Sequence, residues 1–153
     1  MAIINNNGQS KVGVRPRNVN MILDLFPGAS VAYSVRKLKS SYTGAAMRIR
    51  RSSDNSELNI MFDSIGNLDM ISLSAFCGIS NGYVVTWYDQ SGNGFDMSQQ
   101  AVNSQPLIWN GSAIYRGTRP AIFNTSSGQL LKNINAINLG STHTFFSVID
   151  FES

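Results

Sequence analysis

One segment, YVVTWYDQSGNG at residues 83–94, constrains the fold of this chain more than any other. Its first half is β-branched and aromatic, a composition that suits a pleated, half-buried surface. Its second half is rich in Gly, Asn, Asp and Ser, and the glycines supply the positive φ that turns need. Because side chains alternate across a strand, both faces of this strand carry bulk. The segment therefore predicts a central strand of a layered β structure that ends in a polar loop.

The end of this strand presents an aromatic residue and a carboxylate, Trp87 and Asp89. Sugar-binding and metal-binding loops often lie at such a sheet edge. The simpler interpretation is that Trp87 belongs to the core and that Asp89 caps the turn. The sequence favours the simpler interpretation and leaves the functional one open.

Length and composition point to one mainly β domain. A chain of 153 residues can bury a genuine core, and abundant Asn, Ser and Gly between short apolar runs favour many turns over a helical bundle. A single cysteine, Cys77, excludes an internal disulfide and is expected to be buried packing. Only one histidine is present, so no Cys/His cluster has the spacing of a structural zinc site. No apolar run is long enough to span a bilayer.

The basic residues gather at the front of the chain. Residues 1–51 hold nine of the twelve Lys and Arg residues and one acidic residue. Residues 1–20 are poor in apolar side chains and carry Lys11, Arg15 and Arg17, which predicts an extended anchoring arm that docks on an acidic protein surface. They also lack the apolar stretch of a secretory signal. No aromatic platform interleaves the basic residues, so nucleic-acid binding is not expected.

Residues 21–153 are expected to form the sandwich. Apolar residues at helical spacing predict a helix over residues 28–39. Residues 45–51 and 57–62 alternate around a polar loop, which predicts a hairpin. Arg48 and Arg50 are expected to face solvent, and Leu58, Ile60 and Phe62 are expected to face inward.

Further elements follow along the chain. A second helix is expected over residues 68–76, with Asn67 or Asp69 as its N-cap and Gly78 at its end. A tight turn is expected at Asn110 and Gly111. The last strand, residues 142–151, has two apolar faces and few predicted neighbours, so the sandwich is expected to be incomplete in this chain.

Four segments together resemble a known family. They are residues 32–38 (AYSVRKL), 41–46 (SYTGAA), 48–54 (RIRRSSD) and 87–94 (WYDQSGNG). In this order they resemble the amino-terminal half of the catalytic domain of arabinofuranosidase B-type α-L-arabinofuranosidases, over about residues 29–124. The resemblance implies a concanavalin A-like antiparallel β-sandwich of the LamG or jelly-roll kind. Similar segments are also found in phage and bacterial surface proteins.

The resemblance implies that the nucleophile and acid carboxylates of these enzymes lie in the carboxy-terminal half of their domain. Glycoside hydrolysis needs two carboxyl groups about 5–9.5 Å apart. The family's enzymes also pair a cysteine near Cys77 with a second one, where this chain has Ser80 and Asn81. The expectation is therefore that the chain has no catalytic residue and is not an enzyme. The candidate carboxylates of the chain are Asp54, Glu57, Asp63, Asp69, Asp89, Asp96, Asp150 and Glu152.

The leading hypothesis from the sequence is a structural virion protein, such as a phage head or tail-fibre protein, released by host lysis. Its arm would bind other virion proteins, and its lectin-like sandwich would bind a glycan or host surface as a homo-oligomer, most simply a trimer. An arabinofuranoside hydrolase and a purely architectural oligomerisation module are the alternatives. No membrane insertion is expected.

Ligand-binding residues are expected near the strand end and the following turns. The stacking candidates are Trp87, Tyr88, Trp109 and Tyr115, and the hydrogen-bonding candidates are Asp89, Gln90 and Asn93. Asp89 and Asn93 are weak Ca²⁺ candidates, and no other cofactor is expected.

Overall fold

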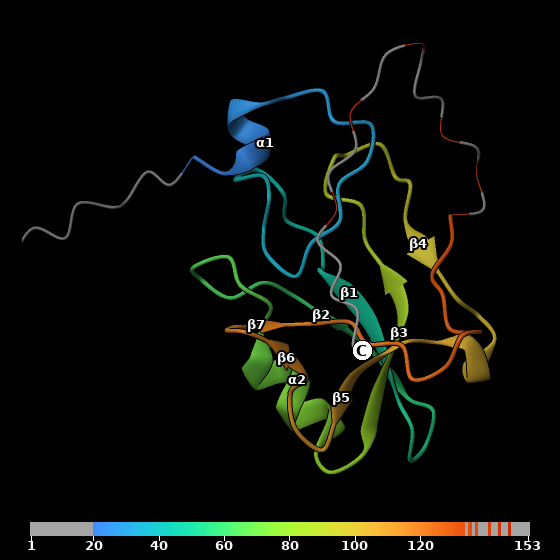
Figure 1. The fold of residues 1–153 in the computed structure, drawn as a ribbon. Coiled ribbons are helices and arrows are strands. Elements are labelled where there is room, and N and C mark those ends of the chain that lie inside the picture. Colours follow the sequence, from blue (N-terminus) through green and yellow to red (C-terminus); the bar gives the residue numbers. More distant parts are fainter. Residues whose placement is uncertain are drawn as a thin grey trace, which may run out of the picture.

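A computed structural model of the protein describes residues 20–133 together with positions 135, 137, 141, 144 and 147 (Figure 1). The predicted arm, with Lys11, Arg15 and Arg17, lies outside the described residues. The predicted strand over residues 142–151 lies outside them as well, apart from positions 144 and 147. No described helix is both long and apolar enough to cross a membrane.

The described fold is mainly β, as predicted, and one antiparallel sheet forms its centre. β3 (Asn81–Trp87) pairs with β1 (Met47–Arg51) on one side, and with β4 (Met97–Ser98) and β5 (Leu107–Asn110) on the other. β2 (Glu57–Ile60) pairs with β1 and forms an edge of the sheet. The prediction that the YVVTW segment is a central strand is confirmed.

α2 (Met70–Cys77) contributes Leu73 and Cys77 to the hydrophobic core. Asp69 caps its first turn by accepting hydrogen bonds from the amides of Ile71 and Ser72, and Gly78 ends it at φ +55°. Both cap predictions are confirmed. The buried core cluster comprises Ala46, Met47, Ile49, Ile60, Leu68, Leu73, Cys77, Val84, Ile108 and Trp109.

The remaining elements are short. α1 (Ile22–Leu25) precedes the sheet, and a 3₁₀ turn (Val102–Ser104) precedes β5. The predicted turn at Asn110 and Gly111 is confirmed by the antiparallel bridge between Trp109 and Ala113, with Gly111 at φ +88°. A small hairpin of β6 (Tyr115–Arg116) and β7 (Arg119–Pro120) follows.

The helix predicted over residues 28–39 is wrong, because this segment is irregular and extended. Its backbone groups bond to distant parts of the chain instead of to each other. The Lys37 amide donates to the Gly66 carbonyl at 2.7 Å, and the Leu38 amide donates to the Gln90 side chain at 2.7 Å. Tertiary hydrogen bonds thus override a weak helical periodicity.

The hairpin of β1 and β2 is confirmed, but two side-chain predictions in it are wrong. Arg50 is 5% exposed, since the face opposite the core is covered here by Gln105 and Tyr83. Its Nε donates to Gln105 Oε1 at 2.7 Å, and its guanidinium lies 4.8 Å from the centre of the Tyr83 ring. Leu58 is 41% exposed, because β2 is at the sheet edge, whereas Ile60 is buried as predicted.

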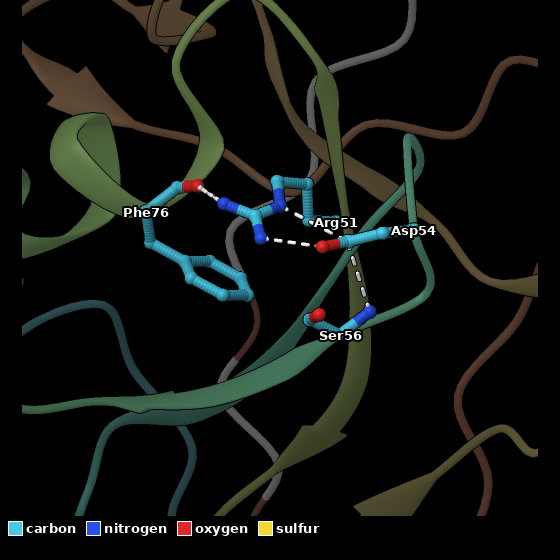
Figure 2. Close-up of polar contacts among 4 residues, drawn as sticks. All are labelled: Arg51, Asp54, Ser56 and Phe76. Carbon is cyan, nitrogen blue, oxygen red and sulfur yellow. Dashed lines mark hydrogen bonds and ion pairs between the residues drawn. The ribbon is translucent and has the colours of Figure 1, made fainter.

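Arg51 connects the loop between β1 and β2 to α2 by hydrogen bonds (Figure 2). Its Nε and Nη2 donate to the two carboxylate oxygens of Asp54, at 3.0 and 2.6 Å. Its Nη1 donates to the carbonyl of Phe76 at 2.7 Å, and the guanidinium lies over the Phe76 ring. The hydrogen bonds from Arg51, followed by those from Ser56, hold the pKa of Asp54 far below its usual value.

This depressed pKa predicts an acid-dependent contribution to stability. The Asp54 carboxylate should stabilise the fold at neutral pH and lose that effect as the pH falls below about 4, the pKa of an unperturbed Asp. We expect Asp54→Asn to flatten the decline of unfolding free energy between about pH 4 and pH 2, measured by urea denaturation. Glu57→Gln, in the same hairpin, is the control. Parallel curves for Asp54→Asn and the unmodified protein would contradict the assignment.

Candidate functional site at the end of β3

Asp89 organises the loop that follows β3. Its Oδ1 accepts hydrogen bonds from the amides of Ala32 and Ser91, at 2.8 and 2.9 Å. Its Oδ2 accepts from the Ser91 hydroxyl at 2.6 Å and from the Phe95 amide at 3.2 Å. The side chain is 5% exposed, and four donors occupy the four acceptor positions of the carboxylate. Asp89 therefore connects the two ends of the loop that follows β3 and also binds the backbone of Ala32 to this loop.

Two neighbouring amide side chains hold the rest of the same segment. Gln90 is fully buried; its Oε1 accepts from the Leu38 amide, and its Nε2 donates to the carbonyls of Ser34 and Arg36. Asn93 Nδ2 donates to the carbonyl of Ser30 at 2.9 Å. These bonds explain why residues 29–38 stay extended across the end of the sheet.

An aromatic pair lies beside this loop. The ring centroids of Tyr33 and Trp87 are 5.8 Å apart, at an interplanar angle of 48°. The Tyr33 hydroxyl donates to the Phe95 carbonyl, which ties the pair to the loop. Trp87 Nε1 is buried and has no hydrogen-bond partner in the described structure. An unpaired indole N–H is unusual, since buried donors are nearly always satisfied.

The site also contains an exposed carboxylate, that of Asp96. Its Oδ1 accepts from the Asp89 amide at 2.9 Å, while the Asn133 amide group donates to its backbone carbonyl. Burial, followed by the charge of Asp89, raises the pKa of Tyr33, and burial followed by the charge of Asp96 raises the pKa of Tyr42. Both phenols therefore stay protonated. The site combines a ring face with negative charge, and this favours a ligand rich in hydroxyl donors.

The structure brings together only some of the predicted ligand-binding residues. Trp87 lies beside the loop of Asp89, Gln90 and Asn93, as the sequence suggested. Trp109 instead is buried with its Nε1 donating to the Gly78 carbonyl, at the opposite end of β3. The other two stacking candidates are Tyr88 and Tyr115. The Tyr88 hydroxyl donates to Asn59 Oδ1, and Tyr115 is 48% exposed in β6.

Two residues of this site escaped the sequence reasoning. Asp96 was considered only as a catalytic carboxylate, and Tyr33 was assigned to a helix that does not form. The family resemblance could have pointed to Tyr33. Two of the segments that carry it, residues 32–38 and 87–94, are hydrogen-bonded to each other in the structure. Ligand binding by the seven residues expected from the sequence stays a prediction, with Asp89 and Gln90 already engaged by the chain itself.

The described residues offer little to a metal ion. They contain no group of three or more His, Cys, Asp or Glu side chains that could hold one. The carboxylate of Asp89 is filled by donors, and the Nδ2 of Asn93 donates to backbone carbonyls. The Ca²⁺ role considered for Asp89 and Asn93 stays a prediction.

Comparison with known proteins assigns the chain to a class and then to a family. The described fold is a mainly β domain with an aromatic pair and acidic side chains at the end of its central strand. The family model described as alpha-L-arabinofuranosidase B, catalytic, matches residues 26–140. The chain belongs to this family, and the resemblance seen in the sequence is confirmed.

Solved structures of arabinofuranosidases are similar over part of the chain. One is an arabinofuranosidase complexed with arabinofuranosyl-α-1,2-xylobiose, and another is a GH54 α-L-arabinofuranosidase soaked with a cyclic sulfate inhibitor. Each is 31% identical with a TM-score of 0.46, and the match covers 51% of this chain and 17% of the other. The chain thus spans about a sixth of their length. Among curated proteins no match is found.

The family assignment corrects one expectation. The sequence reasoning held that the chain is not an enzyme, because the reacting carboxylates of the family were placed elsewhere. A match to a catalytic-domain model over residues 26–140 overturns this view, since the chain carries the sequence pattern of a glycoside hydrolase domain. The chain covers 17% of the arabinofuranosidase structures to which it is similar.

Proposed function

We propose that the protein acts on α-L-arabinofuranosides as a glycoside hydrolase. The match of residues 26–140 to the catalytic-domain model carries this proposal. The end of β3 supports it, because a ring pair and an exposed carboxylate form the kind of surface that a sugar contacts. In this assignment Tyr33 and Trp87 contact a sugar face, and Asp96 accepts a hydrogen bond from a sugar hydroxyl.

The described carboxylates divide into those that hold the fold and those with an unengaged oxygen. Asp54 is paired with Arg51, Asp69 caps α2, and Asp89 is filled by four donors. The oxygens of these three carboxylates already accept hydrogen bonds from the chain. Asp96 uses one carboxylate oxygen, which leaves the other for a ligand. Since hydrolysis needs two carboxyl groups, Asp96 is assigned to sugar positioning, and we assign no described carboxylate to the bond cleavage.

The hydrolase proposal predicts release of 4-nitrophenol from 4-nitrophenyl α-L-arabinofuranoside by the purified protein. The matched control substrate is 4-nitrophenyl β-D-xylopyranoside, which should be cleaved at least tenfold more slowly. Asp96→Asn keeps the bond to the Asp89 amide but removes the charge, so KM should rise about tenfold, the effect of losing one charge-assisted hydrogen bond. Absence of release, or equal cleavage of both substrates, would refute the proposal.

Carbohydrate binding without hydrolysis is the second candidate, and the same surface favours it. In that case methyl α-L-arabinofuranoside would bind while the aryl substrate stays intact. A virion location, docking through the basic arm and trimer formation stay predictions from the sequence. No described residue bears on any of them.

A further inference from the structure

A second surface, remote in sequence from the β3 loop, forms a groove with a volume of about 250 Å³. Three segments wall it: residues 35–36, residues 63–71 at the start of α2, and the hairpin of β6 and β7, which lies beside α2 (Figure 1). Tyr115 lines the groove and is 48% exposed. The volume suits one sugar ring better than a long oligosaccharide.

Two arginines of this groove have no anionic partner. The Arg36 guanidinium makes no hydrogen bond in the described structure, and Arg119 donates only from Nη1, to Asn67 Oδ1 at 3.1 Å. The ion pairs of the described residues involve Arg48 and Arg51, neither of which lines the groove. Both arginines line the groove and keep free N–H donors, which attract an anion and suit a carboxylate, since a guanidinium can bind one in a forked geometry.

The acidic residues of the groove are already engaged. Asp69 accepts three hydrogen bonds at the start of α2, from the amides of Ile71 and Ser72 and the Ser72 hydroxyl. Asp63 Oδ1 accepts from the amides of Ile65 and Asn67. These hydrogen bonds occupy both oxygens of Asp69 and one oxygen of Asp63, and the second oxygen of Asp63 stays available to a hydroxyl group. The groove therefore offers a ring platform, two unpaired cations and one hydroxyl acceptor.

We propose that this groove binds a sugar unit that carries a carboxylate, a hexuronosyl residue of an acidic glycan. Arg119 and Arg36 bind the carboxylate, Tyr115 stacks on the sugar ring, and Asp63 accepts from a ring hydroxyl. The groove does not include Tyr33, Trp87 or Asp96, so this proposal neither requires nor supports the hydrolase assignment, although Gln90 of the β3 loop bonds to the Arg36 carbonyl. The groove would bind an acidic polysaccharide at a second position, in addition to the β3 site.

The test titrates the full chain with methyl α-D-galacturonoside and with methyl α-D-galactoside, which differ at one carbon, by calorimetry. We expect the uronoside to bind at least tenfold more tightly, with an affinity that falls as salt is raised. Arg119→Gln and Tyr115→Ala should each weaken uronoside binding at least tenfold, and Tyr115→Phe should retain it. Arg48→Gln, an exposed arginine of β1, should have no effect.

Three outcomes would overturn the proposal. They are absence of binding, equal binding of the two sugars, and unchanged binding after Arg119→Gln. If Arg119→Gln loses structure because its bond to Asn67 is lost, Arg36→Gln replaces it, since the Arg36 side chain makes no such bond. Unchanged uronoside affinity in Arg36→Gln would count equally against the site.

Discussion

Replacing Asp89 with Asn should lower the unfolding free energy by about 3 kcal/mol, the scale of hydrogen bonds to a buried charge. An amide retains one oxygen for the Ala32 and Ser91 amides but turns an NH₂ group toward Phe95, whose amide is also a donor. The loop would lose a charged acceptor and leave a buried donor unpaired. The unfolding midpoint in urea measures the effect.

Asp63→Asn is the matched control for this prediction. Asp63 also accepts two backbone amides through one oxygen, but it is exposed, and its second oxygen makes no bond in the described structure. An amide can therefore replace it with a loss below about 1 kcal/mol. If Asp89→Asn were as mild as Asp63→Asn, the loop would not depend on the Asp89 carboxylate. Other contacts would then have to hold residues 29–38 in their extended form.

Gly82→Ala should be the second severe change, with a loss of about 2–3 kcal/mol from overpacking. Gly82 is the second residue of β3, and an added Cβ would come within 2.7 Å of Cys77 Sγ and 3.1 Å of Trp109 Cβ. Both neighbours are buried and have little room to move. Thermal or urea unfolding of the variant measures the loss.

A double variant separates this clash from a change in strand propensity. Cys77→Ala removes the sulfur atom nearest to the added Cβ, so the two substitutions together should be less destabilising than their sum. Gly128→Ala, where an added Cβ meets nothing within 4 Å, should be neutral. Strict additivity of Gly82→Ala and Cys77→Ala would show that the crowding at α2 is not the cause.

The sequence predicted the elements whose signals are local. β3 was recognised from its β-branched and aromatic residues, the hairpin of β1 and β2 from its alternation, and α2 from Asp69 and Gly78, which are the caps that it uses. Each of these depends on neighbouring residues alone. The mainly β class followed from the same signals.

The errors arose where distant residues decide the structure. Residues 28–39 have apolar residues at helical spacing, but Asp89 and Gln90 bind their backbone in an extended form. Arg50 has the alternation of an exposed residue, yet Gln105 comes from more than fifty positions away to cover it. No local pattern reveals such pairings. They also explain why Tyr33 was not recognised as part of the β3 site.

The central claim is that the end of β3 binds an arabinofuranosyl group, and the indole N–H signals of the two tryptophans test it most directly. Trp87 Nε1 has no described partner and lies beside Tyr33, whereas Trp109 Nε1 is bonded to Gly78 at the other end of the strand. In a nitrogen–proton correlation spectrum, methyl α-L-arabinofuranoside should shift the Trp87 signal and leave that of Trp109 in place. Two unmoved signals, or a shift confined to Trp109, would contradict the account.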